Sequence, residues 1–232
     1  RHDFAVESVH DYLEVLAESR VEVSAPMHAP LHHSPAWESA ATGDPLLMPY
    51  RLSSAMVPDC DSAMWAYAGQ SFLPGRPILE AVMELTQRIF TDFQYSPGVT
   101  DITTPVRQVF ESRTGVCQDF AQLQLALMRS HGLACRYVSG YLETQPQPGH
   151  PRLIGADASH AWVAVQVPGL GWVDFDPTNN QMPTDRHITI AWGRDYADVV
   201  PVKGFTNGGG SQSLSVSVDV RAIEDDPSQR FV

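Results

Sequence analysis

The sequence has little positive charge and no long apolar run. Of its 232 residues, 15 are basic and 27 are acidic, which gives a formal net charge of −12. This excess of negative charge opposes binding to phosphate backbones and to anionic lipids. No apolar run approaches the ~20 residues that a membrane-spanning helix needs. We therefore expect neither a nucleic-acid partner nor a membrane partner.

The sequence also has few cysteines, namely Cys60, Cys117 and Cys135. Their odd number argues against a disulfide framework, and free thiols are typical of a reducing compartment, so we expect a cytoplasmic protein. The cysteines do not have the spacing of a metal site. The histidines His28, His32 and His33 have no acidic or cysteine partners at a regular spacing, and no calcium-binding loop is present. The sequence thus predicts no metal and no cofactor.

A candidate nucleophile lies between Arg113 and Phe120. Gly115 predicts a tight turn, and the apolar-rich run that follows Cys117 predicts a buried helix that ends near Gly132. Free N–H groups at a helix start favour an anion by roughly 0.3–1 kcal/mol. Cys117 is therefore predisposed to form the thiolate that attacks acyl groups. The alternative is an inert cysteine in the core.

A candidate base and its partner lie on a predicted β-hairpin. Residues 158–167 and 171–176 alternate like strands, and Pro168-Gly169 is a turn signal between them. A pairing centred on residue 168 places Ala164 opposite Trp172 and His160 opposite Asp176. It requires a three-residue loop or a bulge, because a two-residue turn would put His160 and Asp176 on opposite faces.

Both residues have alternative interpretations. His160 could be a structural histidine. Asp176 precedes Pro177 and could only begin a turn, in which case Asp174, two residues earlier on the same face, would replace it. A cysteine, a histidine and an aspartate in this arrangement nevertheless match a nucleophilic triad.

At this point the chain resembles the bacterial transglutaminase-like proteins, which are often described as cysteine proteases. The resemblance covers roughly residues 45–220 and is carried by five motifs: Gly115-Val-Cys117-Gln-Asp-Phe120, Tyr137-Val-Ser-Gly-Tyr-Leu142, Ser159-His160-Ala-Trp162, Gly171-Trp-Val-Asp-Phe-Asp176-Pro-Thr-Asn179 and Gly193-Arg-Asp-Tyr-Ala-Asp-Val199. It implies an α+β fold with a papain-like, transglutaminase-type core. In that core the nucleophile stands at a helix N-terminus packed on an antiparallel sheet.

The resemblance also implies roles and a reaction. Cys117 would be the nucleophile, His160 the general base and acid, and Asp176 the residue that orients the histidine. The reaction would be acyl transfer from the amide bond of a peptide or protein through a thioester, with hydrolysis and transamidation both open. Two alternatives remain: a non-enzymatic domain-interaction protein that retains the fold, and a coenzyme A-dependent N-acyltransferase.

Substrate contacts are expected beside the triad. The candidates are Gln118, next to the nucleophile, together with Trp162, Trp172 and Asp174 on the face of His160. Such a wall is aromatic and acidic, which suits a neutral or amine-bearing amide better than an anionic acyl carrier.

The chain divides by composition into four parts. Residues 1–24 alternate like strands and are expected to be the tail of a truncated N-terminal β-domain, and the proline-rich residues 25–58 are expected to be a linker. A catalytic domain over 59–223 and a charged tail over 224–232 follow. Within the domain, apolar spacing predicts helices over 77–93 and 104–110, and alternation predicts strands at Cys135–Tyr137, 188–192 and 214–220.

Overall fold

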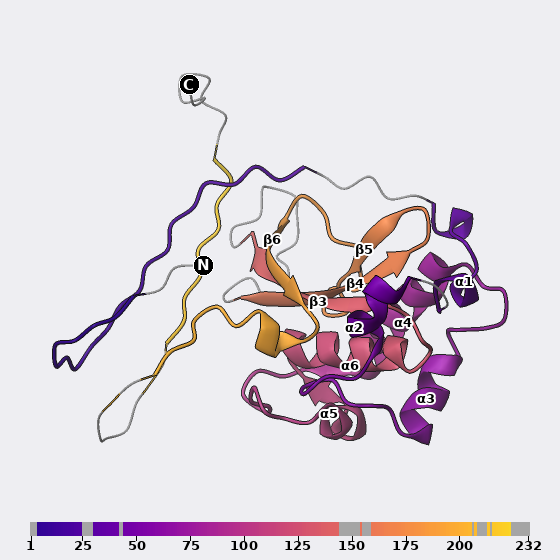
Figure 1. The fold of residues 1–232 in the computed structure, drawn as a ribbon, viewed down its shortest axis with the longest axis horizontal. Helices are drawn as coiled ribbons and strands as arrows, with labels where there is room; N and C mark the ends of the chain where they lie inside the picture. The colour runs from indigo at the N-terminus through magenta and orange to yellow at the C-terminus, as the bar shows by residue number, and fades with distance from the viewer. Residues whose placement is uncertain are drawn as a thin grey trace.

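The computed structural model of the chain describes residues 4–24, 30–41, 44–143, 154, 159–205, 207, 213 and 215–223. A four-stranded antiparallel sheet and a group of helices on one of its faces form two layers (Figure 1). The strands stand in the order β5-β4-β3-β6, with bounds Cys135–Leu142 for β3, His160–Val167 for β4, Gly171–Phe175 for β5 and His187–Gly193 for β6. This arrangement confirms the predicted α+β class.

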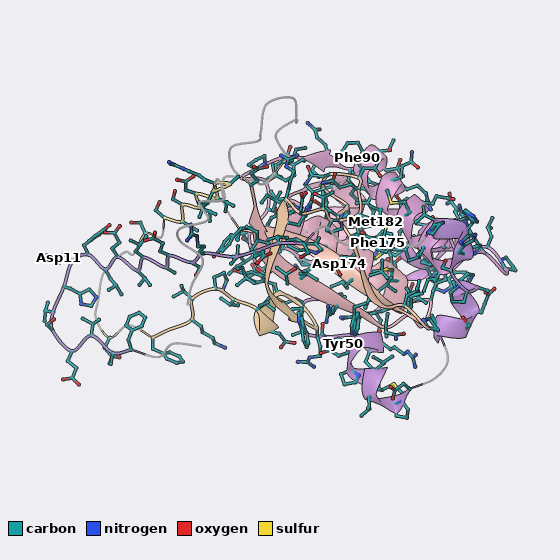
Figure 2. All side chains as sticks on the ribbon, turned by 90° about the horizontal axis from the view of Figure 1, so that it is seen from above. Asp11, Tyr50, Phe90, Asp174, Phe175 and Met182 are labelled. Carbon is teal, nitrogen blue, oxygen red and sulfur yellow. The ribbon has the colours of Figure 1, made fainter. Side chains whose placement is uncertain are left out.

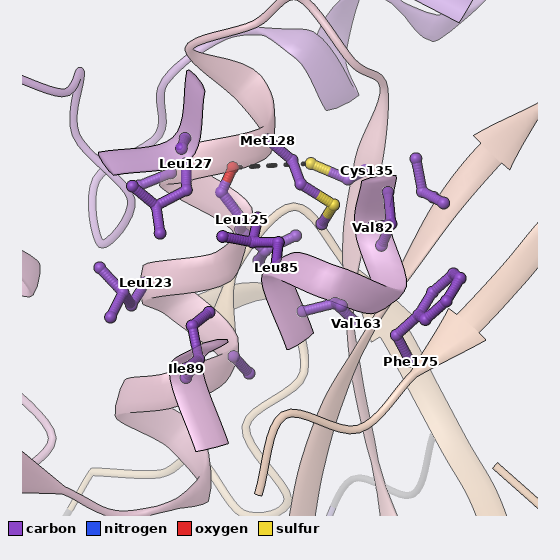
Figure 3. Packing of buried hydrophobic residues seen from close by; sticks show 14 of the residues in the cluster. Val82, Leu85, Ile89, Leu123, Leu125, Leu127, Met128, Cys135, Val163 and Phe175 are labelled. Atoms are coloured by element: carbon purple, nitrogen blue, oxygen red, sulfur yellow. Dashed lines mark hydrogen bonds between the residues drawn. The ribbon is translucent and has the colours of Figure 1, made fainter. Parts of the chain in front are cut away.

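Helix α6, Cys117–Arg129, lies between the sheet and the other helices. All of its residues except Gln118 are buried, as expected for a helix packed on every side. Its buried polar groups therefore need partners, and Gln124 Nε2 donates to Thr86 Oγ1 at 2.8 Å. Figure 3 shows the apolar packing around α6, with Cys135 Sγ near the Leu125 carbonyl oxygen at 3.7 Å.

The helix predicted over 77–93 is α4, Ile78–Asp92, and its apolar residues Val82, Leu85 and Ile89 face the core (Figure 3). The helix predicted over 104–110 is α5, Val106–Ser112. The remaining elements of the described residues are the helices α1 Trp37–Ala41, α2 Met48–Arg51 and α3 Ser62–Gly69, the 3-10 turns Leu31–His33, Pro45–Leu47 and Tyr196–Asp198, and the paired short strands β1 Gln94–Tyr95 and β2 Thr114–Gly115. No helix in the described part of the chain is long and apolar enough to cross a membrane.

The hairpin of β4 and β5 forms, but its predicted pairing is wrong. Val167 pairs with Gly171 and Ala164 pairs with Asp174, so the pairing is centred on residue 169 instead of 168. The required three-residue loop over 168–170 is present, and Gly169 takes a φ of 79° there. The error displaces every partner by two residues. Because side chains alternate with a period of two, the predicted faces are unchanged.

A β-bulge interrupts the pairing of β3 with β6. Ser139 pairs with Ala191, but the next residue, Gly140, pairs with Thr189, which leaves Ile190 without a partner on β3. Ile190 is accordingly 55% exposed. An extra residue reverses which side chains of the strand face each side of the sheet. From the start of β6 at His187 up to the bulge, every side chain is therefore on the opposite face from the one it would take in a regular strand.

The described part of the proline-rich stretch packs against the body. Ala40 and Val57 are buried. Arg129, at the end of α6, is also buried. Its guanidinium donates to the carbonyl oxygen of Tyr50 at 3.1 Å and to Ser54 Oγ at 3.3 Å. It also donates to the carbonyl oxygens of Cys135, at 3.0 Å, and Arg194. Residues 45–57 are thereby tied to the end of the nucleophile's helix.

The strands predicted near both ends of the chain are not formed in the described residues. Residues 4–24, 213 and 215–223 carry no strand pairing, and 4–24 extend away from the body, as Asp11 shows in Figure 2 (see also Figure 1). His28 and the tail 224–232 lie outside the described residues. The division of the chain into four parts and its cytoplasmic location stay predictions.

Candidate active site

Cys117 is the first residue of α6, as predicted, and Asp119 fixes the start of that helix. The Asp119 carboxylate accepts hydrogen bonds from the Val116 N–H at 2.8 Å and from Thr100 Oγ1 at 2.7 Å. A Cβ on Gly115 would lie 2.8 Å from Asp119 Cβ, so the glycine before the nucleophile is required by this close approach. Burial raises the pKa of the Asp119 carboxyl although these hydrogen bonds oppose the shift.

Cys117 is 9% exposed, and its Sγ lies 4.0 Å from the carbonyl oxygen of Ser159, the residue directly before β4. All three cysteines are unpaired. Burial raises the pKa of both other thiols, Cys60 and Cys135, to about 11. The raised pKa favours the protonated form of both thiols at neutral pH, which is the less reactive form.

His160 and Asp176 meet as predicted, despite the displaced pairing. His160 Nε2 lies 2.9 Å from Asp176 Oδ2, and both side chains are fully buried. Among the described residues, His160 Nδ1 has no hydrogen-bond partner. Since Nε2 faces a carboxylate, the ring proton of the neutral form belongs on Nε2. The lone pair of Nδ1 is then available as a base.

Asp176 also begins a turn, so two interpretations that were alternatives in the sequence hold together. Its Oδ1 accepts the backbone N–H groups of Thr178 at 2.9 Å and Asn179 at 3.2 Å, while Oδ2 faces His160. The Asn179 side chain donates to Oδ2 at 2.8 Å. Asp174, the proposed substitute, instead accepts the Trp162 indole N–H at 2.9 Å.

The charges of the pair stabilise each other. Burial works against the protonated form of His160, but the Asp176 carboxylate and, to a smaller degree, the Cys117 thiol beside the ring outweigh it, and the pKa of His160 is raised. Burial likewise works against the Asp176 carboxylate, but the interactions with His160 and with a second histidine, His187, hold its pKa well below the ordinary value. The carboxylate thus stabilises the protonated ring that forms when Nδ1 takes a proton from Cys117.

Sequence reasoning missed His187. Its Nε2 lies 3.2 Å from Asp176 Oδ2, and the side chain is buried. One nitrogen of each histidine and an Asp176 oxygen lie within 4.8 Å of one another, which is close enough to hold a metal ion. However, the Thr184 N–H points at His187 Nδ1 at 3.3 Å, which leaves the ring proton on Nε2, directed at the carboxylate. We therefore interpret the group as a hydrogen-bond network, and the absence of a metal stays a prediction.

The predicted substrate contacts lie in two places. Gln118 is partly exposed beside Cys117, and its Nε2 lies 3.5 Å from the Ile102 carbonyl oxygen. Trp162 has no exposed surface and packs with Val138, Ala164 and Trp172 on the sheet face of His160. Asp174 is partly buried and is the neighbour of Phe175 on β5 (Figure 2). Substrate contact by these residues stays a prediction.

Two surface hollows lie apart from the site. A polar one of about 370 Å³ is lined by residues of 98–108, and an apolar one of about 530 Å³ is lined by Trp37, Trp65, Phe72 and His131 among others. Neither is lined by Cys117, His160 or Asp176. The Thr100–Asp119 hydrogen bond nevertheless joins the polar hollow to the first turn of α6.

Comparisons with known proteins agree with this geometry. The family model described as the transglutaminase-like superfamily matches residues 67–177, a range that contains Cys117, His160 and Asp176. An uncharacterised protein from Mycobacterium tuberculosis is 43% identical over 234 residues, which cover 96% of this chain and 74% of the relative. A protein-glutamine gamma-glutamyltransferase from Pseudomonas aeruginosa is 33% identical over 76 residues, 32% of this chain and 11% of that enzyme.

Among solved structures, a Cytophaga hutchinsonii protein that is provisionally described as a cysteine protease is similar. Its TM-score is 0.59 at 26% sequence identity, and the match covers 78% of this chain. The chain spans 61% of that structure's length, which is less than two thirds.

Proposed function

Because this chain belongs to the transglutaminase-like superfamily, we propose that it is a cysteine-dependent enzyme that transfers acyl groups from peptide-like amides through a thioester on Cys117. One observation carries the proposal. His160 is held by Asp176 through Nε2 at 2.9 Å, while its Nδ1 has no partner in the described part of the chain and the Cys117 thiol lies beside the ring. An oriented base next to a thiol at a helix start is the arrangement that nucleophilic catalysis needs.

The steps follow from this division of roles. The proton of the Cys117 thiol passes to His160 Nδ1, and the sulfur forms a bond to the carbonyl carbon of the amide. As the carbon–nitrogen bond breaks, His160 returns the proton to the departing amine, and a thioester remains. Water or a second amine then attacks the thioester, its proton passes to His160, and the sulfur leaves as the thiolate.

The negative oxygen of each tetrahedral intermediate needs donors, and the Cys117 backbone N–H is the first candidate. Hydrolysis is the favoured outcome, since no residue of the site, among those that the structure describes, marks a place for a second amine. The net charge of −12 suits a neutral or amine-bearing peptide or protein as the acyl donor. None of these steps requires a metal or a cofactor.

Selective alkylation tests the nucleophile. Limiting iodoacetamide at neutral pH, followed by intact-mass and peptide mass spectrometry, should label Cys117 ahead of Cys60 and Cys135. The other two thiols are internal controls because burial raises their pKa to about 11. Equal labelling of all three would remove the case for an activated thiol.

An acyl-donor panel tests the reaction. Mass spectrometry of the intact chain should show a covalent acyl group after exposure to peptide amides, and the Cys117→Ala variant should show none. Acylation by a coenzyme A thioester, without acylation by any amide, would favour the N-acyltransferase. A chain that none of the donors acylates would favour a non-enzymatic interaction protein.

A further inference from the structure

Asp176 binds two histidines through the same oxygen. His160 Nε2 lies 2.9 Å and His187 Nε2 lies 3.2 Å from Oδ2. His187 lies outside residues 67–177, the range that the family model matches, and outside the three roles assigned above. Its buried position beside the reacting groups needs an explanation of its own.

The bulge in β6 aims His187 at this oxygen. After the bulge, Leu142 pairs with His187 and Gly140 pairs with Thr189, and Gly140 also pairs with His160 on the other side. Residues 140 and 142 are on the same face of β3, so His187 is on the face of His160. Without the extra residue at Ile190, Leu142 would pair with Ile188, and His187 would be on the opposite face. A bulge that redirects a side chain beside a site is a recurrent feature of functional sheets.

The surroundings fix the orientation and the tautomer of the ring. The Trp162 ring lies edge-on to His187 at 5.4 Å between centroids and 5.9 Å from the His160 ring. The Thr184 N–H lies 3.3 Å from His187 Nδ1, so this nitrogen accepts and Nε2 carries the proton. A neutral His187 can therefore donate to Asp176, but it cannot take a proton from His160.

We propose that His187 is a positioning residue, which holds the Asp176 carboxylate ionised and correctly oriented so that His160 Nδ1 stays turned to Cys117. The inference rests on the proposed function. His187 touches no reacting atom in this scheme and acts only through Asp176. Its donation completes the set of donors around that carboxylate, alongside the Asn179 side chain and two backbone N–H groups.

The pH response follows from the groups that face Asp176. His160 faces it from β4 and His187 faces it from β6. The carboxylate of Asp174 on β5 is hydrogen-bonded to Trp162 instead. The Glu143–Arg186 ion pair, with a 2.9 Å contact, lies next to the start of β6. Loss of the His187 donor leaves the carboxylate less firmly held, so it stabilises the protonated His160 ring less and the Cys117 thiol gives up its proton less readily. The acid limb of Cys117 reactivity should then move to higher pH.

Alkylation rates of the full chain test the role. The variants are His187→Leu, His187→Gln, whose amide can donate in place of Nε2, and His33→Leu as a matched control at an exposed histidine. We expect His187→Leu to slow Cys117 alkylation about tenfold at neutral pH, the loss expected for a hydrogen bond to a charged group, and to move the acid limb upward. His187→Gln should restore most of the rate, and His33→Leu should match the parent chain.

Each outcome decides one question. A His187→Leu chain with the parent's rate and acid limb, or a His187→Gln chain as slow as His187→Leu, overturns the inference. If Cys117 of the parent chain shows no selective reactivity, the proposed function fails, and nitrogen NMR of the parent still decides the inference. The neutral His187 ring should carry its proton on Nε2, and a neutral ring with its proton on Nδ1 would contradict the inference. If the His187→Leu chain does not fold, the nitrogen NMR spectrum of the parent chain is the deciding measurement.

Discussion

An alanine at position 140 tests how tightly the sheet holds the site together. Gly140 stands opposite the bulge, with His160 as its partner on β4. A Cβ there would lie 2.5 Å from one ring carbon of Trp162 and 2.9 Å from another, and it would also overlap the Ile188 carbonyl oxygen. Trp162 has no exposed surface, so its ring has no free space to move into.

The size of the effect follows from these two clashes. Overpacking costs about 1–3 kcal/mol, and simultaneous clashes with a buried ring and with backbone belong near the upper end. The smaller entropy of the unfolded alanine chain offsets about 0.4–1 kcal/mol of that cost. The net loss is therefore about 2 kcal/mol, and at about 2–4 °C per kcal/mol for a chain of this size the melting temperature falls by about 4–8 °C.

Thermal unfolding followed by circular dichroism measures this loss. The matched control is Gly204→Ala, because a Cβ on Gly204 meets no atom within 4 Å. We expect the control to stay within about 0.5 kcal/mol of the parent. Since the clash displaces Trp162, Cys117 alkylation in the folded Gly140→Ala chain should also be slower. A Gly140→Ala chain with the same melting temperature as the Gly204→Ala control would refute the reasoning.

Four further changes have expected outcomes. Cys117→Ala should melt like the parent chain and fail to form any acyl-enzyme by intact mass. Asp176→Asn should retain some activity in an amide-cleavage assay, because the orienting residue contributes less than the nucleophile. The pKa of Asp176 is lowered in the folded state, so the carboxylate stabilises the fold above its ordinary pKa of about 3.9, and this stability is lost as the pH falls. The free energy of unfolding in urea should therefore depend less on pH below about 5 in Asp176→Asn than in the parent chain. Asp119→Ala removes the cap of α6 and should cost about 1–2 kcal/mol in urea unfolding. Arg129→Met leaves several buried oxygens without a donor and should cost about 3 kcal/mol, measured the same way.

The elements that position Cys117 were predictable because their signals are local. The spacing of Val82, Leu85 and Ile89 fixes the buried face of α4, and the turn at Gly115 followed by an apolar run fixes the start of α6. The capping role of Asp119 was less accessible. Its bond from the Val116 N–H is local, but its second donor, Thr100, lies far from Asp119 in the sequence and reaches it only in the fold.

The meeting of His160 with Asp176 was predicted through a wrong pairing. Alternation determines only which face a side chain takes, whereas the partner depends on where the loop is centred. The loop over 168–170 moved every partner by two residues and left both side chains on one face. The prediction therefore depended on parity, and an error of one residue would have separated the pair.

The same parity rule explains why His187 was missed. The alternation of Ile188, Ile190 and Trp192 predicts that these three side chains share one face of β6. In that arrangement His187 would be on the face that points away from Asp176. The bulge at Ile190 reverses that face. At the bulge the Ile188 carbonyl oxygen lies so close to Gly140 that a Cβ there would overlap it, and these two strands are far apart in the sequence. No pattern within 187–193 contains this information.

The aromatic face beside His160 shows how one interpretation shaped another. Trp162 and Trp172 were expected to form part of the wall of an acyl-donor pocket, and the proline-rich residues 25–58 were expected to be a linker. In the structure Tyr50, from that stretch, packs against Trp172 at 5.3 Å between ring centroids, and Arg136 lies 4.5 Å from the same ring. Composition marks prolines as breaks in regular structure but does not show what a broken segment covers. Tyr50 and Arg136 therefore pack on Trp172, while the Trp162 ring lies against the rings of His160 and His187.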